Sequence, residues 1–332
     1  MINTGERAYA YAKACGIIGK SFVGRRVNSL KPLSRLSELD RLVFGTGARE
    51  LPERELLPDL ERRFSRRSVA SVITLVNSFK NPPLLLTQLL RVYEYADLKT
   101  ALTLINETSA KPEWVPLGRF GTVHFEAWPD AKAMLSGTDL EFLYEQNFEP
   151  NGISLETALD RHYYGKLWKD LRKLKKTDRI TAEKICAEEI ILRNCAWVLR
   201  LRTYYGMNAE EVKRHLVIIE DEPQLTKDAL AALEFSLDHP EDWAKWKQLR
   251  FLNPAASIGV WRANPRYFQN SASGYLYRLA LVNFRKRPFS IDTVFCFIKL
   301  KQFEEDVLTS NAEGLGMGLS GQDVLSMLEA SS

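Results

Sequence analysis

Residues that commonly do chemistry are few in this sequence, and they stand far apart. No histidine has a glutamate or a second histidine at a spacing that binds a metal ion, and no two cysteines form a Cys-x-x-Cys pair. We therefore expect isolated structural histidines and reduced, mostly buried thiols, with no metal site. The histidines are His124, His162, His215 and His239, and the cysteines are Cys15, Cys186, Cys195 and Cys296.

Motifs for nucleophilic catalysis or nucleotide binding are also missing. The sequence has no Gly-x-Ser-x-Gly and no Gly-x-x-x-x-Gly-Lys-Ser/Thr. Gly314-Leu-Gly316-Met-Gly318 follows a predicted helix and not a strand, so we expect a loop between helices there. Carboxylate pairs such as Glu188-Glu189 and Glu304-Glu305 lie on predicted helices, where exposed faces and helix pairing are their usual roles. We therefore predict no catalytic residue and no cofactor-binding residue.

Three basic clusters could grip phosphates, and three aromatic residues could stack on bases. The alternative is that each cluster lies at a helix end or on an outer face, where Lys and Arg near a C-terminus suit the helix dipole. We favour that alternative and expect no nucleic-acid partner. The clusters are Arg62-Arg63-Phe64-Ser65-Arg66-Arg67, Arg172-Lys173-Leu174-Lys175-Lys176 and Phe284-Arg285-Lys286-Arg287, and the aromatic residues are Trp261, Tyr267 and Phe268.

The elements that must position these residues are almost all helices. Apolar residues recur at three- and four-residue intervals, as in Leu89, Leu90, Tyr93 and Leu98, and strand-like alternation is nowhere sustained. We expect an all-α fold. The predicted helices span residues 4–29, 34–45, 53–80, 82–106, 154–176, 179–205, 272–287, 289–310 and 318–330.

Helix breakers and helix starts divide the chain further. We expect turns at Asn81-Pro82-Pro83, Thr177-Asp178 and Arg287-Pro288, and irregular connections around Pro112–Pro129 and from Asn253 to Ser273. Two phrases predict helix starts, because each combines capping and first-turn residues: Asp238-His239-Pro240-Glu241-Asp242 and Ser320-x-x-Asp323.

The turns mark three long-helix hairpins, over residues 53–106, 154–205 and 272–310. The second helix of each carries a similar phrase, the second copy 97 positions after the first and the third a further 113 positions on. A long internal period indicates repeated supersecondary units. We therefore predict three similar helical units, at about 1–107, 108–206 and 207–332, whose hairpins superpose by rotation about one axis. The phrases are Glu94-x-x-Asp97-Leu98-x-x-Ala101-Leu102, Ile191-x-x-Asn194-Cys195-x-x-Val198-Leu199 and Glu304-x-x-Val307-Leu308.

Charge follows the same division. The 332 residues include 46 Lys and Arg against 42 Asp and Glu, a net charge of +4 that argues against a strongly basic nucleic-acid binder. Residues 1–110, 161–206 and 248–302 carry +6, +7 and +8, and residues 111–160, 207–247 and 303–332 carry −6, −5 and −6. No apolar run approaches the ~18 residues of a spanning helix, so we expect a cytoplasmic or membrane-peripheral protein.

Four phrases, in order and spacing, resemble those of the C subunit of bacterial and archaeal A/V-type ATPases, whose eukaryotic relative is the V-ATPase d subunit. Asp97 and Val307 stand where the family usually has Asn, and Lys13 and Thr309 stand where it has Arg. The phrases are Tyr9-Ala-Tyr11-Ala-Lys13-Ala with a short helix around Leu36–Phe44, Arg91-Val-Tyr-Glu94-Tyr-Ala-Asp97-Leu98-Lys99, Glu189 to Arg202, and Lys301 to Leu308 continuing into Ala312-Glu313-Gly314-Leu315.

This resemblance implies three similar helical units around a pseudo-three-fold axis, together forming a funnel. It also implies a non-catalytic rotor adaptor that joins central-shaft subunits of the D and F type to the membrane proteolipid ring. Such a protein is peripheral, on the cytoplasmic side, and needs no catalytic residue, cofactor or metal. The alternatives are an unrelated α-helical repeat scaffold that binds protein or nucleic acid, and an enzyme whose site has no recognised motif.

Overall fold

The computed structural model describes residues 4–105, 111–145, 153–254 and 260–329. All regular structure in these ranges is helical, so the predicted all-α class is confirmed. Within the same ranges, no helix is both long enough and apolar enough to cross a membrane.

Contacts group the chain into two compact units, each of which draws on distant parts of the sequence. The first unit comprises Met1–Pro82, Thr177–Ala182 and Ser273–Ser332, and the second comprises Pro83–Lys176 and Glu183–Ala272. This grouping does not test the predicted division at residues 1–107, 108–206 and 207–332, which stays a prediction together with its rotation axis.

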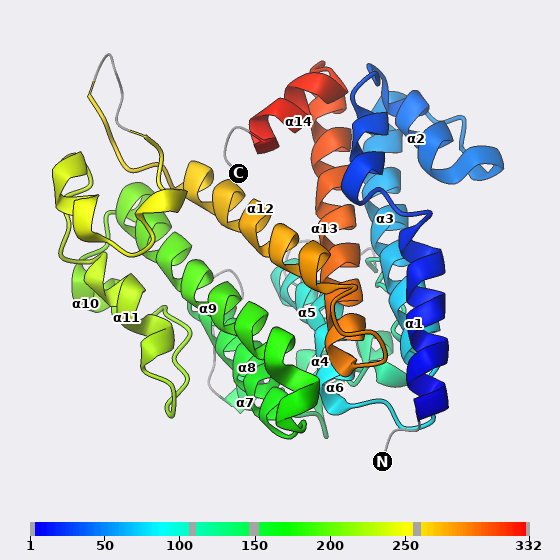
Figure 1. Cartoon of the computed structure of the whole chain (residues 1–332), viewed down its shortest axis with the longest axis horizontal. Coiled ribbons are helices and arrows are strands. Elements are labelled where there is room, and N and C mark those ends of the chain that lie inside the picture. Colours follow the sequence, from blue (N-terminus) through cyan, green and yellow to red (C-terminus); the bar gives the residue numbers. More distant parts are fainter. Residues whose placement is uncertain (1–3, 106–110, 146–152, 255–259, 330–332) are drawn as a thin grey trace. The chain divides into compact units, whose positions relative to one another are not determined.

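Figure 1 labels the α-helices, which are distributed between the two units. The first unit contains α1 (Thr4–Ile18), η1 (Gly24–Leu30), α2 (Leu36–Phe44), η2 (Gly45–Gly47), α3 (Glu53–Val76), α13 (Ile291–Gly316) and α14 (Gly321–Glu329). The second contains α4 (Leu84–Leu90), α5 (Val92–Leu104), η3 (Gly118–Phe120), η4 (Phe125–Ala127), α6 (Ala131–Leu135), α7 (Phe142–Glu145), α8 (Ile153–Arg172), α10 (Ala209–Lys213), α11 (Gln224–Ala231), η5 (Pro240–Lys245) and η6 (Leu249–Phe251). The remaining two, α9 (Lys176–Tyr205) and α12 (Pro265–Asn283), have residues in both.

The core of the first unit forms where α13 lies along α3 (Figure 1). Leu56, Leu60 and Phe64 recur every four residues on α3, and this spacing places them on one helix face. That face packs in one cluster with Leu308 and Leu315 of α13. The same cluster takes in Phe22, Leu30, Leu33, Leu36, Leu39, Val307, Ala312 and Leu325.

In the second unit, α4 and α5 both pack on α8. Gln88 Nε2 on α4 donates to the carbonyl oxygen of Tyr163 at 3.4 Å, and the Tyr95 and Tyr163 rings meet edge to face at 5.3 Å. In the first unit, α13, the second helix of the predicted hairpin 272–310, packs on α3, the first helix of hairpin 53–106. In the second unit, α5, from the second half of hairpin 53–106, packs on α8, the first helix of hairpin 154–205. The predicted hairpin 53–106 is itself divided, because α3 belongs to the first unit and α4 and α5 to the second.

Two predicted helices are each interrupted. The helix predicted over 4–29 ends at Ile18, and a 3₁₀ helix begins at Gly24, whose φ of +61° suits glycine and interrupts an α-helix. The helix predicted over 82–106 is interrupted at Arg91, where α4 ends and α5 begins. Asn106 and Ala330, at predicted helix ends, lie outside the described residues.

Two predicted connections are also wrong. The stretch from Asn253 to Ser273 was expected to be irregular, but α12 begins at Pro265. Asn264 Oδ1 accepts the Tyr267 backbone N–H at 3.0 Å, and proline at the first helical position needs no N–H partner, so this pair starts the helix. Thr177-Asp178 lies within the first turn of α9 and not in a turn between helices. Residues 255–259 lie outside the described part of the chain.

The C-terminal end of the first unit confirms one prediction and corrects another. Ser320 and Asp323 form the predicted reciprocal cap: the Asp323 N–H donates to Ser320 Oγ at 3.2 Å, and the Ser320 N–H donates to Asp323 Oδ2 at 3.1 Å. The loop expected over Gly314–Gly318 is wrong for Gly314 and Gly316, since α13 continues through both. A glycine at 314 allows α13 to approach Val324 of α14 closely.

Candidate functional site

Two oppositely charged residues on α13, Lys301 and Glu304, are buried, each with 2% of its surface exposed. Lys301 Nζ donates to the Glu304 carboxylate and lies 3.3 Å from Ser21 Oγ. Glu304 Oε1 accepts the Phe22 backbone N–H at 2.8 Å and lies 3.6 Å from Arg67 Nη2. Burial lowers the pKa of Lys301, and Glu304 opposes this shift. This α13 cluster ties the helix to α3 and to the segment that follows α1.

A second cluster has the same chemistry and lies at the junction of α4 and α5. Arg91 Nε donates to Glu94 Oε2 at 2.6 Å, and its two terminal nitrogens donate to the Asp139 carboxylate at 3.0 and 2.9 Å. Glu94 in turn accepts the backbone N–H groups of Thr122 and Val123. Burial disfavours the charge on Arg91, but these carboxylates raise its pKa. This α5 cluster ties the helix to the connection that follows it.

The two clusters occupy matching positions of the repeated phrase. Glu94 and Glu304 are the first residues of their copies, each is buried, and each pairs with the basic residue three positions earlier, Arg91 or Lys301. Each glutamate also accepts backbone N–H groups of a separate segment. Matching sequence positions thus carry matching contacts. Ile191 stands at this place in the middle copy, so the ion pair is absent from α9.

The fourth position of the repeated phrase makes matching contacts in the first and middle copies. Asp97 Oδ2 accepts the Val115 N–H at 2.7 Å, and Asn194 Oδ1 accepts the Val217 N–H at 2.8 Å. Asn194 is fully buried and also donates to the Val217 carbonyl oxygen at 2.9 Å. Both side chains therefore fasten the connection that follows their helix. Such contacts brace a helical body, because the side chains of Glu94, Glu304, Asp97 and Asn194 are each held by hydrogen-bond partners within the chain.

Replacing Asp97 by asparagine is expected to stabilise the protein by about 1 kcal/mol at pH 7.5 and to have little effect at pH 4. Burial raises the pKa of Asp97 to about 6; the Val115 N–H opposes this, and the Glu94 charge adds to it. An unfolded Asp has a pKa of about 3.9, so the folded state holds the proton more tightly and loses stability as the pH rises from about 4 to 6. Asparagine keeps an acceptor for Val115 without the charge.

Urea unfolding of both proteins at pH 4 and pH 7.5 measures this difference. The expected gain in the free energy of unfolding is smaller than the value that corresponds to the full pKa shift, because Asp97 is only partly buried. Equal stability changes at the two pH values would contradict the assigned cause.

Several side chains of the basic clusters form ion pairs within the chain. Arg63 has 12% of its side chain exposed, pairs with Asp40 at 2.9 Å and lies 3.7 Å over the Phe44 ring. Arg172, which ends α8 as expected, pairs with Glu183 at 2.7 Å and with Glu222. Further pairs join Arg62 to Asp59, Lys173 to Asp170, and Arg287 to Asp292.

Two of the three aromatic residues considered for base stacking are buried. Phe268 is fully buried between the rings of Trp246 and Phe251, at centroid distances of 5.5 and 5.9 Å. Trp261 is 8% exposed, and its Nε1 donates to the Asn253 carbonyl oxygen at 3.2 Å. These rings pack inside the second unit and offer no face to a base.

Two of the four histidines have hydrogen-bond partners within the chain. His162 Nδ1 lies 2.6 Å from the Tyr95 hydroxyl, and His215 Nδ1 lies 2.9 Å from Thr157 Oγ1. The other two, His124 and His239, precede the first residues of the 3₁₀ helices η4 and η5. Across the described residues, no group of three or more His, Cys, Asp or Glu is arranged to hold a metal ion. Cys186, Cys195 and Cys296 are buried free thiols, and Cys15 is a half-buried one.

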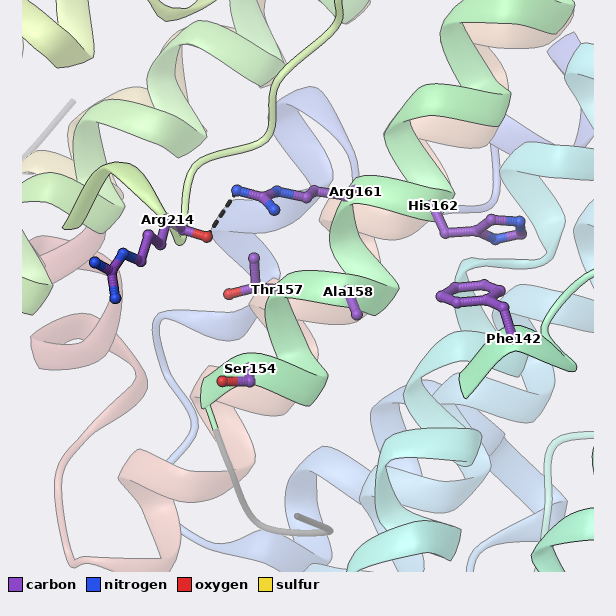
Figure 2. Close-up of a pocket in the computed structure, with 7 residues that line it drawn as sticks. All are labelled: Phe142, Ser154, Thr157, Ala158, Arg161, His162 and Arg214. Atoms are coloured by element: carbon purple, nitrogen blue, oxygen red, sulfur yellow. Dashed lines mark hydrogen bonds between the residues drawn. The ribbon is translucent and has the colours of Figure 1, made fainter. Parts of the chain in front are cut away.

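The second unit also contains an open pocket of about 590 Å³ (Figure 2). Most of its lining comes from one face of α8, where the spacing brings residues of successive turns together. Sequence reasoning missed this pocket, although that polar stripe, with its three- and four-residue spacing, was a legible signal. The lining residues are Phe142, Ser154, Thr157, Ala158, Arg161, His162 and Arg214.

Comparison with known proteins places these features in a family. The family model of the ATP synthase (C/AC39) subunit matches residues 46–327. A protein of Treponema pallidum (strain Nichols), described as an uncharacterized protein, is 27% identical over 315 residues, which are 93% of this chain and 92% of that protein. The matched range includes α3, the α5 cluster, the pocket and both charged residues of the α13 cluster.

Proposed function

Because the chain belongs to the ATP synthase (C/AC39) subunit family, we propose that it is the central-stalk adaptor of an A/V-type rotary ATPase. In this role it joins the central-shaft subunits of the D and F type to the membrane proteolipid ring. It thereby couples ATP hydrolysis or synthesis to the movement of protons or sodium ions. It is itself non-catalytic and lies at the cytoplasmic face, peripheral to the membrane.

The observation that carries this proposal is the family match over residues 46–327. The buried clusters support it, because an adaptor that transmits torque must resist deformation. Charged pairs held between helices and connections add rigid, directional contacts to a close-packed core. The role also requires two durable interfaces, each of the obligate size of about 2,000 Å² or more.

The three-unit architecture, with its pseudo-three-fold axis and funnel, belongs to the same proposal. It is supported by the matching contacts of Glu94 and Glu304 and of Asp97 and Asn194. A further support is the pairing of helices, in which α5 packs on α8 and α13 on α3. Both pairings join the second helix of one hairpin to the first helix of another, as a closed ring of repeats requires.

Co-isolation tests the proposal. We expect an affinity-tagged chain, expressed in its own cells and extracted in mild detergent, to purify with proteolipid-ring and shaft subunits. Recovery of the chain free of both, together with salt-sensitive binding to RNA or DNA, would favour the helical scaffold instead.

A further inference from the structure

The pocket of the second unit lies beside the first half of α8, and none of its lining residues belongs to the two ion-pair clusters. Its volume of about 590 Å³ is within the range that holds small molecules. Arg214, which follows α10, and Phe142 of α7 complete the lining, and Figure 2 shows them on different sides of α8. All three elements belong to the same compact unit.

Arg161 is held in a fixed orientation at this pocket. Its Nε donates to the Leu216 carbonyl oxygen at 2.8 Å, and its Nη2 donates to the Arg214 carbonyl oxygen at 2.7 Å (Figure 2). The neighbouring contact between Thr157 and His215 fastens the same two segments together. The remaining Nη1 group has a defined position because the rest of the guanidinium is anchored.

No ion pair neutralises the two arginines of this pocket, Arg161 and Arg214, among the residues that the structure describes, although Glu210 is near enough to Arg214 to feel its charge. Burial lowers the pKa of Arg161, and burial together with the charges of both arginines lowers the pKa of His215. A partly desolvated cation without an acidic neighbour is unfavourable, and a bound anion would relieve that cost.

The two carbonyl contacts of Arg161 have a structural purpose, since they secure the turn after α10. They do not explain why a second arginine, with an exposed side chain, lines the same pocket. The carbonyl contacts also do not explain why Arg161 has no carboxylate partner. Other arginines of this unit, such as Arg91 and Arg172, do have acidic partners.

The other end of the pocket is aromatic. Figure 2 shows the rings of His162 and Phe142 together, away from the two arginines, and their centroids are 5.2 Å apart. The Tyr95 hydroxyl contacts His162 Nδ1, and burial lowers the pKa of His162, which favours its neutral form. This end therefore suits a flat or apolar group and not a charged one.

We propose that this pocket binds a phosphate monoester carrying an aromatic group, as in a nucleotide. The phosphate accepts hydrogen bonds from Arg161 and is attracted by Arg214, and the aromatic group packs towards His162 and Phe142. This site goes beyond the adaptor role and does not depend on it, because it is defined by side chains of a single unit.

Titration of the full-length chain tests the site, with inorganic phosphate and AMP as probes and phosphorus NMR and calorimetry as readouts. AMP is expected to bind more tightly than phosphate, because only AMP reaches the aromatic end. Arg214→Gln should weaken both probes about tenfold, as the loss of one charged contact predicts. Phe142→Ala should weaken AMP and leave phosphate unchanged.

Arg200→Gln is the matched control, since Arg200 is exposed on α9, lies over the Trp197 ring and does not line the pocket. Arg214 is the preferred test position, because replacing Arg161 also removes two carbonyl contacts and weakens the fold. The proposal is overturned if neither probe binds at millimolar concentration, or if Arg214→Gln and Arg200→Gln bind alike. Binding of AMP and phosphate with equal affinity would overturn the proposed contact of the aromatic group with His162 and Phe142.

Discussion

Replacing Glu304 by alanine is expected to lower the free energy of unfolding by about 3–5 kcal/mol, because it leaves Lys301 buried without its acidic partner. Lys301 has only 2% of its surface exposed, so water cannot replace the lost carboxylate. The Phe22 backbone N–H loses its acceptor in the same variant, which adds to the cost. Urea unfolding followed by circular dichroism measures the change.

A surface pair with the same spacing provides the control. Glu210 and Lys213 lie three residues apart at 2.7 Å, but both are exposed, and Glu210→Ala should leave the midpoint of unfolding unchanged. A double variant, Lys301→Met with Glu304→Leu, should recover part of the loss, because it removes both buried charges. If Glu304→Ala unfolds at the same urea concentration as Glu210→Ala, the proposed bracing role of the α13 cluster is wrong.

Replacing Gly321 by alanine is expected to destabilise the protein by about 1–3 kcal/mol, because the start of α14 touches the backbone of residues 30–33. A Cβ atom at this position would overlap the Leu30 carbonyl oxygen and lie 3.0 Å from its carbon and 3.4 Å from the Leu33 oxygen. Backbone atoms cannot turn aside as a flexible side chain can. The Gly321 N–H also donates to the Leu33 oxygen at 2.8 Å, and this bond fixes the approach.

Gly165 offers the opposite case in the same experiment. It lies within α8, and a Cβ atom there meets nothing within 4 Å. Alanine loses less backbone entropy than glycine on folding, so Gly165→Ala should raise stability by about 0.5–1 kcal/mol. A loss of stability in Gly321→Ala together with a gain in Gly165→Ala would support the observed packing of α14. A loss at both positions, or at neither, would contradict it.

Much of the fold was predictable because helix periodicity is a local property. The apolar spacing of α5 and α9, and the cap formed by Ser320 and Asp323, depend on residues a few positions apart. The start of α12 is equally local: Asn264 followed by Pro265 is a helix-start signal, although the stretch around it is otherwise typical of an irregular connection. The family resemblance drawn from four phrases is confirmed by the match over residues 46–327.

The buried clusters could not be predicted, because their partners are remote in sequence. Phe22 and Glu304 are separated by 282 positions, and no local pattern indicates that they meet. Of the two usual roles expected for Glu304-Glu305, Glu304 has the one that joins helices, and it is almost fully buried. Periodicity shows that a carboxylate lies on a helix, but burial depends on what packs against that helix.

Ion pairs between basic and acidic segments explain part of the alternation of charge along the sequence. Arg91 and Lys166 come from basic segments and pair with Asp139 of an acidic connection. Arg172 pairs in the same way with Glu222 of the next acidic connection. These pairs join basic helices of the second unit to acidic connections of the same unit.

Co-purification from native membranes is the sharpest test of the proposal that this chain joins the shaft of a rotary ATPase to its membrane ring. The tagged chain should recover proteolipid and shaft subunits in constant ratio through affinity and size-exclusion steps. Gly165→Ala, which leaves the fold intact, should recover the same set. A chain that elutes alone from membranes in which the rest of the ATPase remains assembled would contradict the account.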